Sequence, residues 1–478
     1  MEQKKIISSL TYKFIERISV KALGLIISIV LARLLAPNDF GQLAIITVFI
    51  NLSQTIIQGG FNTALVQSKS IEENDYSTVF YISAFASVLF IIALYFGAPF
   101  IADYYESNEL VWPLRVYSFT LIFAAFNSIQ VAKLQREMKF KSMMFSSLMA
   151  TVISGMIGIL LSYMGFGIWA LVMYNFSYIV FSCVTMLFST KWLPKLIFSI
   201  ERAKKLFSYG WKMLVSAILC SVYTDIRTLI VGKKFSTEDL AYYNRGQQFP
   251  GTVSNTLDSS IQSVMFPAMS SFQDNIEHVK SILRRSMTLG TLVIVPIMMG
   301  LAVTSETVIY ILLGEKWLPC VFYMQIICLA EASMPLTSSN LVAIKSIGRS
   351  DVYMKLEIVR RVVMIFILLI SVFCFNSVQA IVVGYLISSW IDYLIIVIPV
   401  KKLLKYGFGA QVKDIWKIIL ASVCMSIAVY TISFFELQII LELIIQIIVG
   451  TIAYLLMCWL LKIDSFVYLK KQLIKTFK

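Results

Sequence analysis

Charged residues are scarce in this 478-residue chain, and their scarcity excludes an ordinary soluble domain. Asp, Glu, Lys and Arg together make up 14% of the residues, whereas soluble domains carry roughly 25%. Apolar residues make up 58%, and the mean hydropathy is +0.80. A soluble fold of this length cannot bury so much apolar surface in one core, so the composition predicts an integral membrane protein.

Residues and motifs that carry chemistry are also scarce. The sequence has one histidine, His278, and seven cysteines, none in a CxxC pair. It contains no HExxH motif and no Gly-Lys-Ser/Thr phosphate-binding loop, so it shows no metal site and no ATP site. No polar connection exceeds about 20 residues, which is too short for a soluble catalytic domain. We therefore expect no cofactor, no metal and no enzymatic activity.

The net charge of +14 is compatible in itself with nucleic-acid binding, but the positions of the cations argue against it. Lysines and arginines gather in short loops between apolar runs, as membrane orientation signals do. The opposite loops carry few cations, and loop 102–110 is acidic. We therefore predict no nucleic-acid partner and place both termini on the cytoplasmic side of the membrane. The basic segments are 133–142, 189–206, 280–285, 401–413 and 470–478.

Apolar segments long enough to cross a bilayer, which takes roughly 20 residues, predict an all-α integral membrane fold with about 14 spans. The least apolar of them are 240–266 and 318–344. The predicted cores are 10–34, 41–66, 77–101, 111–132, 143–164, 167–188, 209–232, 240–266, 286–304, 318–344, 356–375, 378–400, 416–434 and 439–461.

The sequence repeats weakly after about 200 residues. The turn at 34–43 aligns with 234–243, and in both a span ends, an aspartate follows, and the next span begins. We interpret these aspartates, Asp39 and Asp239, as helix caps. A second weak similarity pairs residues 135–140 with residues 347–352. Because the offset covers six spans, it predicts two six-helix lobes in parallel repeat, residues 1–200 and 205–400, followed by a C-terminal helical hairpin and basic tail at 413–478.

A charged stripe opens the first span. Lys13, Arg17 and Lys21 are four residues apart and therefore share one helix face, with Glu16 beside them. Such residues either extend to the headgroups or face a cavity inside the protein. We interpret Lys13 as a headgroup contact. Arg17 and Lys21, which lie deeper, are candidates for binding an anionic substrate, and Glu16 is a candidate for moderating their charge.

In the second lobe, Asp225 and Arg227 lie in the seventh span and Arg245 in the eighth. Asp225 and Arg245 form either a structural ion pair or, with Arg227, part of a phosphate site, since arginine binds phosphate through a planar fork. Glu331, deep in the tenth span, is a candidate for carrying a coupling proton or sodium ion. Arg360 and its neighbours are interpreted as headgroup contacts.

The second span has amides at Gln54 and Gln58 on one face. These amides either bind sugar hydroxyls or form hydrogen bonds between helices.

Several motifs resemble those of bacterial polysaccharide flippases in the multidrug/oligosaccharidyl-lipid/polysaccharide exporter superfamily. They are Leu-Leu-Ala-Pro-Asn-Asp-Phe-Gly-Gln-Leu at 34–43, Gln-Gly-Gly-Phe-Asn-Thr-Ala-Leu-Val-Gln at 58–67, Lys-Leu-Gln-Arg-Glu-Met-Lys-Phe at 133–140 and Leu-Gly-Glu-Lys-Trp at 313–317. The resemblance covers essentially the whole chain. It implies a MATE-like fold and the transfer of an undecaprenyl-diphosphate-linked oligosaccharide to the outer leaflet, for O-antigen, capsule or exopolysaccharide.

The resemblance also implies residue roles and partners. Flippases of lipid-linked peptidoglycan precursor use arginines in the first, second and eighth helices; Arg17 and Arg245 match two of these, while the second span here has none. Implied partners are the lipid-linked glycan, membrane lipids, and a polysaccharide polymerase with its chain-length protein. Two alternatives remain open: a MATE-type multidrug exporter, and a membrane polymerase or glycosyltransferase, which should show a large external loop or an acidic motif.

Overall fold

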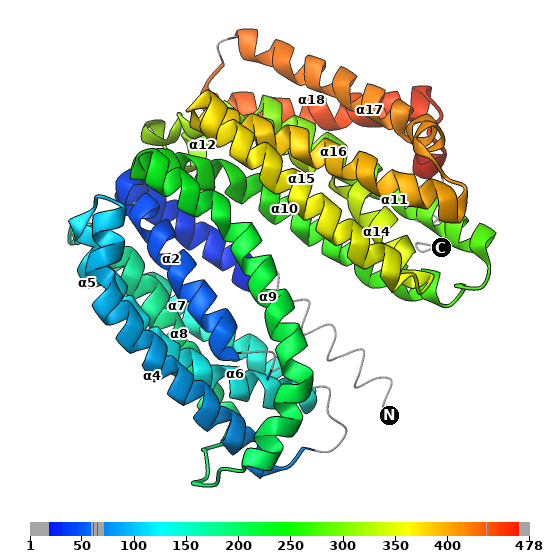
Figure 1. Cartoon of the computed structure of the whole chain (residues 1–478). Coiled ribbons are helices and arrows are strands. Elements are labelled where there is room, and N and C mark those ends of the chain that lie inside the picture. The colour runs from blue at the N-terminus through cyan, green and yellow to red at the C-terminus, as the bar shows by residue number, and fades with distance from the viewer. Residues whose placement is uncertain (1–18, 59–60, 62–64, 66–70, 436, 468–478) are drawn as a thin grey trace. The chain divides into compact units, whose positions relative to one another are not determined.

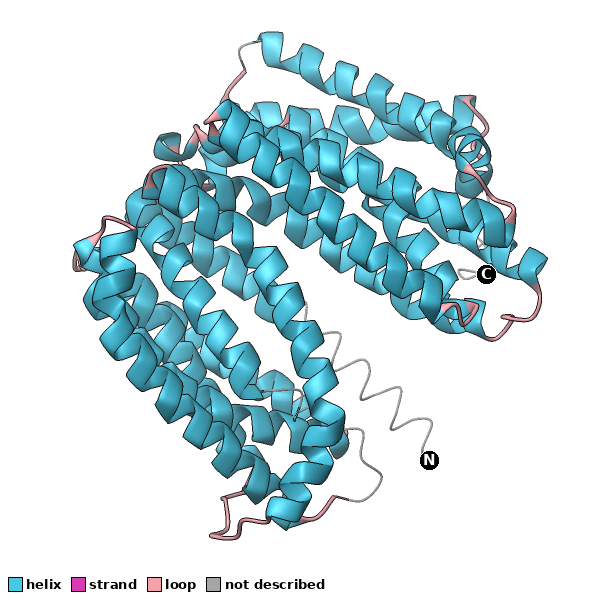
Figure 2. Cartoon of the chain, in the orientation of Figure 1, coloured by secondary structure: helices cyan, strands magenta, loops and turns pink. Residues whose placement is uncertain are grey.

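The computed structural model describes residues 19–58, 61, 65, 71–435 and 437–467 (Figure 1). Every regular element among them is a helix (Figure 2), which confirms the predicted all-α class. Internal contacts divide the chain into two compact units, Met1–Ala241 and Tyr242–Lys478. The lobe boundaries inferred from the sequence repeat stay a prediction.

The first unit begins, in the described residues, with a helix over 19–34. The helices that follow are α2 (Pro37–Gln58), α4 (Glu73–Tyr104), α5 (Val111–Ser118), α6 (Thr120–Arg136), α7 (Phe140–Tyr163), α8 (Ile168–Thr190) and α9 (Ile200–Lys234), with a 3-10 turn at Asn108–Leu110. Helix α8 packs against α6 and α7, and α2 packs against α9.

The helices of the second unit are α10 (Thr237–Ser270), whose first turn belongs to the first unit, then α11 (Ile276–Val303), α12 (Ser305–Leu312), α13 (Cys320–Glu331), α14 (Met334–Ser346), α15 (Ser350–Phe375), α16 (Val378–Leu404), α17 (Phe408–Tyr430) and α18 (Ile439–Leu460). Helix α11 packs against α14 and α17, and α16 packs against α13 and α15. Short 3-10 turns lie at Glu315–Trp317 and Thr431–Phe435.

Twelve helical segments among the described residues are long and apolar enough to cross a membrane, so the chain is a multi-pass membrane protein. Helix α10 matches the predicted span 240–266 but is not one of the twelve, because many of its residues are polar. The first span lies partly outside the described residues, and the count of fourteen stays a prediction. Span 318–344 is two helices, α13 and α14, with a break before Pro335, since proline removes a backbone donor.

Helix α4 shows how these helices pack: it turns small residues inward and large apolar residues outward. Ser83 and Ser87 are buried, and the Ser87 hydroxyl donates to the Leu121 carbonyl oxygen of α6 at 3.1 Å. On the opposite face, Phe85 and Phe96 are exposed, as expected for contact with lipid chains. This arrangement is typical of membrane helices, where small residues allow close approach and polar ones bond between helices.

The two repeated turns have the predicted caps. The Asp39 carboxylate accepts a hydrogen bond from the Ala36 N–H at 3.1 Å, just before α2. At the equivalent place before α10, the Asp239 carboxylate accepts from the Ser236 N–H at 3.3 Å. Both aspartates therefore cap their helices, but from the third helical position, where they accept the N–H of the residue just before the helix; they are not the N-cap residues themselves. The turns also touch, because Thr237 donates a hydrogen bond to the Asn38 side chain.

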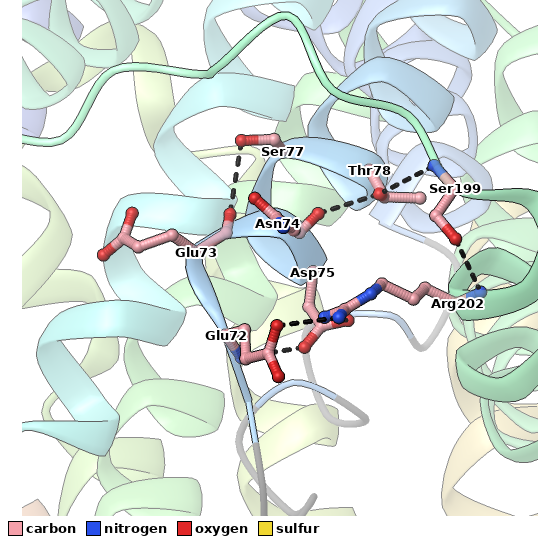
Figure 3. A network of polar contacts seen from close by, with 8 residues as sticks. All are labelled: Glu72, Glu73, Asn74, Asp75, Ser77, Thr78, Ser199 and Arg202. Atoms are coloured by element: carbon pink, nitrogen blue, oxygen red, sulfur yellow. Dashed lines mark hydrogen bonds and ion pairs between the residues drawn. The ribbon is translucent and has the colours of Figure 1, made fainter.

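An ion-pair network holds the start of α9 against the start of α4 (Figure 3). Arg202 forms ion pairs with Glu72 at 2.7 Å and with Asp75 at 3.1 Å. The hydrogen bonds that the Arg202 guanidinium donates to Glu72 and, to a smaller extent, to Asp75 raise the pKa of Arg202. The Ser199 N–H donates to the Thr78 hydroxyl at 3.3 Å. The predicted basic segment 189–206 is thus fixed to α4 by the ion pairs of Arg202 and by backbone hydrogen bonds from Ser199 and Lys195.

We expect Gly41→Ala to destabilise the protein. A methyl group at Gly41 would lie 1.8 Å from the Thr237 carbonyl oxygen, and a backbone atom cannot retract as a flexible side chain can. The expected cost is about 1–3 kcal/mol, measured as a lower midpoint of thermal unfolding in detergent. Gly97→Ala is the matched control, since no atom lies within 4 Å of its added methyl group; equal midpoints for the two variants would contradict this close contact.

Candidate functional site

Part of the predicted substrate site lies outside the described residues: Arg17, Glu16 and the neighbouring Lys13. Lys21 is described, and its side chain is exposed near the start of the helix over 19–34. The exposure of Lys21 agrees with either reading made from the sequence, a headgroup contact or a cavity-facing cation. The roles of these four residues therefore stay predictions.

Arg227 is buried in the first unit, on the helix that packs against α2. A methyl group at Gly232 of α9 would lie 3.2 Å from Ile45 of α2, and the end of α9 lies near the start of α2, so the helices are antiparallel. Five residues along each helix, Arg227 is level with Ile50, and Gln54 follows about one helical turn later. Buried Arg227 and half-buried Gln54 thus lie at similar heights on adjacent helices, and Gln58 lies one further turn along α2.

Asp225 and Arg245 belong to different units. Within the first unit, the Asp225 carboxylate accepts a hydrogen bond from the Ser221 hydroxyl at 3.4 Å. Within the second, the guanidinium of Arg245 donates to the Gln248 side-chain oxygen. Direct pairing of Asp225 with Arg245 stays a prediction.

Buried Arg245 is also stacked on an aromatic ring. Its guanidinium carbon lies 5.4 Å from the centre of the Trp317 ring, a cation–π geometry. Trp317 is fully buried and ends the motif at 313–317. Gly314 in that motif has a φ of +93°, which side-chain-bearing residues rarely adopt. The motif is therefore a turn that places Trp317 beneath Arg245.

The second unit contains a polar cavity of about 390 Å³. It lies among helices α10, α13, α14, α15 and α16, and Glu331, the predicted coupling residue, is part of its lining. The Glu331 carboxylate is nearly buried and accepts hydrogen bonds from the Ser254 hydroxyl at 2.5 Å and the Tyr385 hydroxyl at 2.9 Å. Three helices therefore meet at one carboxylate.

A second carboxylate lines the same cavity. Asp258 is buried and accepts hydrogen bonds from the side chains of Ser338 and Gln262. Asp258 lies in the predicted eighth span, 240–266, and was given no role from the sequence. The sequence feature that could have pointed to it is its spacing: it comes four residues after Ser254, so both lie on one face of α10.

The interpretation of Arg360 as a headgroup contact is wrong. Arg360 is buried and lines the cavity. It donates two hydrogen bonds to Asp392 of α16, one of them at 2.7 Å, and a third to Glu357 at 2.6 Å. A buried arginine requires such partners. Arg360 and Asp392 thus join α15 to α16 at the cavity wall.

One face of α10 is an exposed stripe of hydroxyl and amide side chains. Its exposed members recur every three to five residues, and Ser259 and Thr256 between them are half-buried. The stripe is polar along about three turns, which is unusual in a membrane protein because polar residues there face protein or water. The exposed residues are Thr252, Asn255, Ser260 and Ser263.

These groups suit binding and proton or cation exchange. Within the described part of the chain, no three His, Cys, Asp or Glu side chains lie close enough together to hold a metal ion. The cavity instead combines two hydrogen-bonded carboxylates with an arginine–aspartate pair. The side chains of the α10 stripe donate to carbonyl oxygens of their own helix, and their exposed oxygens can accept further hydrogen bonds from a polar ligand.

Curated relatives of this chain act in bacterial polysaccharide synthesis. Teichuronic acid biosynthesis protein TuaB of Bacillus subtilis (strain 168) is 24% identical over 424 residues, 86% of this chain and 85% of the relative. Succinoglycan biosynthesis transport protein ExoT of Rhizobium meliloti (strain 1021) is 22% identical over 333 residues, 70% and 67% of the two chains. Lipopolysaccharide biosynthesis protein WzxC of Escherichia coli (strain K12) is 23% identical, over 68% of this chain and 67% of the relative.

Solved structures show the same fold. The lipid II flippase MurJ in an inward closed conformation superposes with a TM-score of 0.77, at 17% identity, over 95% of this chain and 99% of that one. An inward-facing MATE multidrug transporter of the MOP superfamily has a TM-score of 0.60, at 14% identity, over 84% and 99%. The predicted MATE-like fold is therefore confirmed.

A family described as "Polysaccharide biosynthesis protein" matches residues 30–322, more than half of the chain. The chain therefore belongs to this polysaccharide biosynthesis family, within the fold of the multidrug/oligosaccharidyl-lipid/polysaccharide exporters.

Proposed function

We propose that this protein moves an undecaprenyl-diphosphate-linked oligosaccharide across the cytoplasmic membrane by alternating access. The observation that carries the proposal is the exposed stripe of hydroxyls and amides on α10, among them Thr252, Asn255 and Ser260. The described residues include twelve apolar helices that can cross a membrane. A polar surface among such helices is expected where something polar passes along it. An oligosaccharide, which presents hydroxyls on every face, matches these side chains.

The diphosphate requires cations as well as hydroxyls. An unpaired anion entering a low-dielectric region costs at least several kcal/mol, so the substrate needs positive side chains along its path. We assign capture to Arg17 and Lys21 in the first helix. Buried Arg227 and Arg245 take over in the half of the membrane opposite the termini, and Gln54 and Gln58 contact the sugar.

The relatives and fold neighbours support this cargo class. The relatives' names specify teichuronic acid, succinoglycan and lipopolysaccharide synthesis, and MurJ is named as a lipid II flippase. A polysaccharide polymerase and its chain-length partner would then receive the exported units. The MATE-type drug exporter remains the second candidate because it shares the fold.

Orientation is the first part of the proposal that can be tested. Both termini are proposed to be cytoplasmic in the inner membrane, because basic loops predominate on their side. Reporter fusions at positions 138 and 198 should give cytoplasmic signals, and fusions at 105 and 236 extracytoplasmic ones. A cytoplasmic signal at 105 would contradict the assignment of the spans around it.

The substrate assignment is tested by Arg17→Gln with Lys21→Gln. Loss of cations that pair with a diphosphate should weaken substrate capture by about 2 kcal/mol or more, roughly thirtyfold. Cells carrying this variant should lose surface polysaccharide and accumulate lipid-linked repeat units, at normal protein level in the membrane. Lys13→Gln, on the same predicted helix face, is the control and should export normally. Normal export by the double variant would overturn the cation assignment, and unimpaired polysaccharide with altered drug resistance would favour a drug exporter.

Glu331 is proposed to couple transport to a proton or sodium gradient, since its carboxylate lies in the cavity and contacts both α10 and α16. Glu331→Gln keeps the size of the side chain but removes its charge. Export by this variant should become insensitive to ionophores that collapse the gradient. Glu306→Gln, at an exposed acid in the first turn of α12, is the control. Unchanged ionophore sensitivity in Glu331→Gln would exclude this role.

A further inference from the structure

A second cavity in the Tyr242–Lys478 unit is larger and strongly basic. It has a volume of about 590 Å³, within the range of roughly 300–1,000 Å³ that is usual for ligand sites. It lies between α11, α17 and the residues just after α18. The charged side chains that line it are Arg284, Arg285, Lys413, Lys417, Asp414 and Asp464. We call this cavity the basic pocket.

Positive charge exceeds negative charge in the basic pocket. Four cations and two carboxylates give a net charge of +2. Asp414 is compensated locally, because Arg284 forms an ion pair with one carboxylate oxygen and the Tyr406 hydroxyl donates to the other at 2.7 Å. Lys413 and Arg285 are exposed at its rim. The pocket is therefore suited to an anion rather than to a cation.

The basic pocket lies where three helices pass from charged to uncharged sequence. The uncharged runs 286–303 and 418–435 begin directly after its cations, and the run 443–461 ends just before Asp464. Lys417 joins two of these ends, since its ammonium donates to the Leu461 carbonyl oxygen at 3.0 Å. Uncharged runs of this length span the hydrocarbon core, so the pocket is level with lipid headgroups.

An exposed apolar stripe leads away from the basic pocket along α17. It starts at Trp416, which lines the pocket and is 46% exposed; tryptophan is enriched at the headgroup boundary. The stripe then continues one helical turn at a time through the hydrocarbon-spanning run. A soluble phosphate has no use for such a surface, whereas acyl chains do. The further exposed residues of the stripe are Leu420, Val423, Ile427 and Tyr430.

We propose that the basic pocket binds the phosphate headgroup of an anionic glycerophospholipid whose chains lie along the α17 stripe. Basic pockets between membrane helices on the cytoplasmic side favour such headgroups. The bound lipid would hold α11, α17 and the end of α18 together at the membrane surface. This site is separate from the cavity around Glu331, and its occupancy does not depend on the cargo proposed above.

The test uses the full-length protein in detergent, titrated with dioleoyl-phosphatidylglycerol and followed by native mass spectrometry and thermal unfolding. The wild-type protein should bind this lipid, with a raised unfolding midpoint, and should bind dioleoyl-phosphatidylcholine much more weakly. Arg285→Gln with Lys413→Gln should weaken phosphatidylglycerol binding about thirtyfold, from the loss of two interfacial cations. Arg285→Lys with Lys413→Arg keeps both charges and should bind as the wild type does.

Lys355→Gln with Lys402→Gln is the matched control, because it removes two exposed cations of the same unit outside the basic pocket. Equal weakening in this control would overturn the proposal, as would unchanged binding in the pocket variant. Inorganic phosphate or farnesyl diphosphate competing at lower concentration than phosphatidylglycerol would also overturn it, in favour of a soluble anion or a polyprenyl substrate. If the pocket double variant does not fold, Lys413→Gln alone should show a smaller loss of about fivefold.

Discussion

Hydrocarbon offers no hydrogen-bond partner, and this constraint links the packing of the helices to the placement of their polar residues. A serine, an acid or an arginine that turns inward must find its partner in its own helix or on another one. Ser87 bonds to α6, Glu331 joins α10 to α16, and Arg360 joins α15 to α16. Each of these contacts between helices also fixes a pair of helices. The large apolar residues, such as Phe85 and Phe96, are left to face lipid.

Where the structure describes the family motifs, they form turns and helix contacts, which explains why they specify the fold and leave the sugar open. Asp39 caps α2, Gly41 allows the Thr237 backbone to approach, and Gln42 donates to Glu109 at 2.7 Å. Trp317 lies beneath Arg245. The α10 residues that we propose contact the cargo, such as Thr252 and Asn255, lie outside these motifs. We therefore expect relatives named for different polysaccharides to share the turns and to differ along the α10 stripe.

Local features of the sequence predicted the helices and their caps, because hydropathy and capping depend on residues a few positions apart. Asp39 and Asp239 are examples. These local features cannot predict which residues pair when the two are far apart in the chain. Asp392 is 32 residues from Arg360, and the rotation of α15 that buries Arg360 depends on how α16 packs. A cation near a helix end was read as a headgroup contact for the same reason. Glu331 was recognised from its depth alone, without Ser254 and Tyr385.

The polarity of α10 has a consequence for how the protein is made. Only two residues separate this helix from the end of α9. The Ser338 and Glu331 side chains that bond to it, however, lie 80 and 77 residues further along the chain than their partners on α10. At roughly 5–20 residues per second, α10 leaves the ribosome about 4–16 s before those partners. During that time Asp258 and the hydroxyl groups of α10 do not yet have the partners on α13 and α14 to which they bond in the folded protein. Helix α10 must therefore stay in the insertion machinery, or near water, until α13 and α14 arrive, so the first unit can be complete in the membrane while the second is still being assembled.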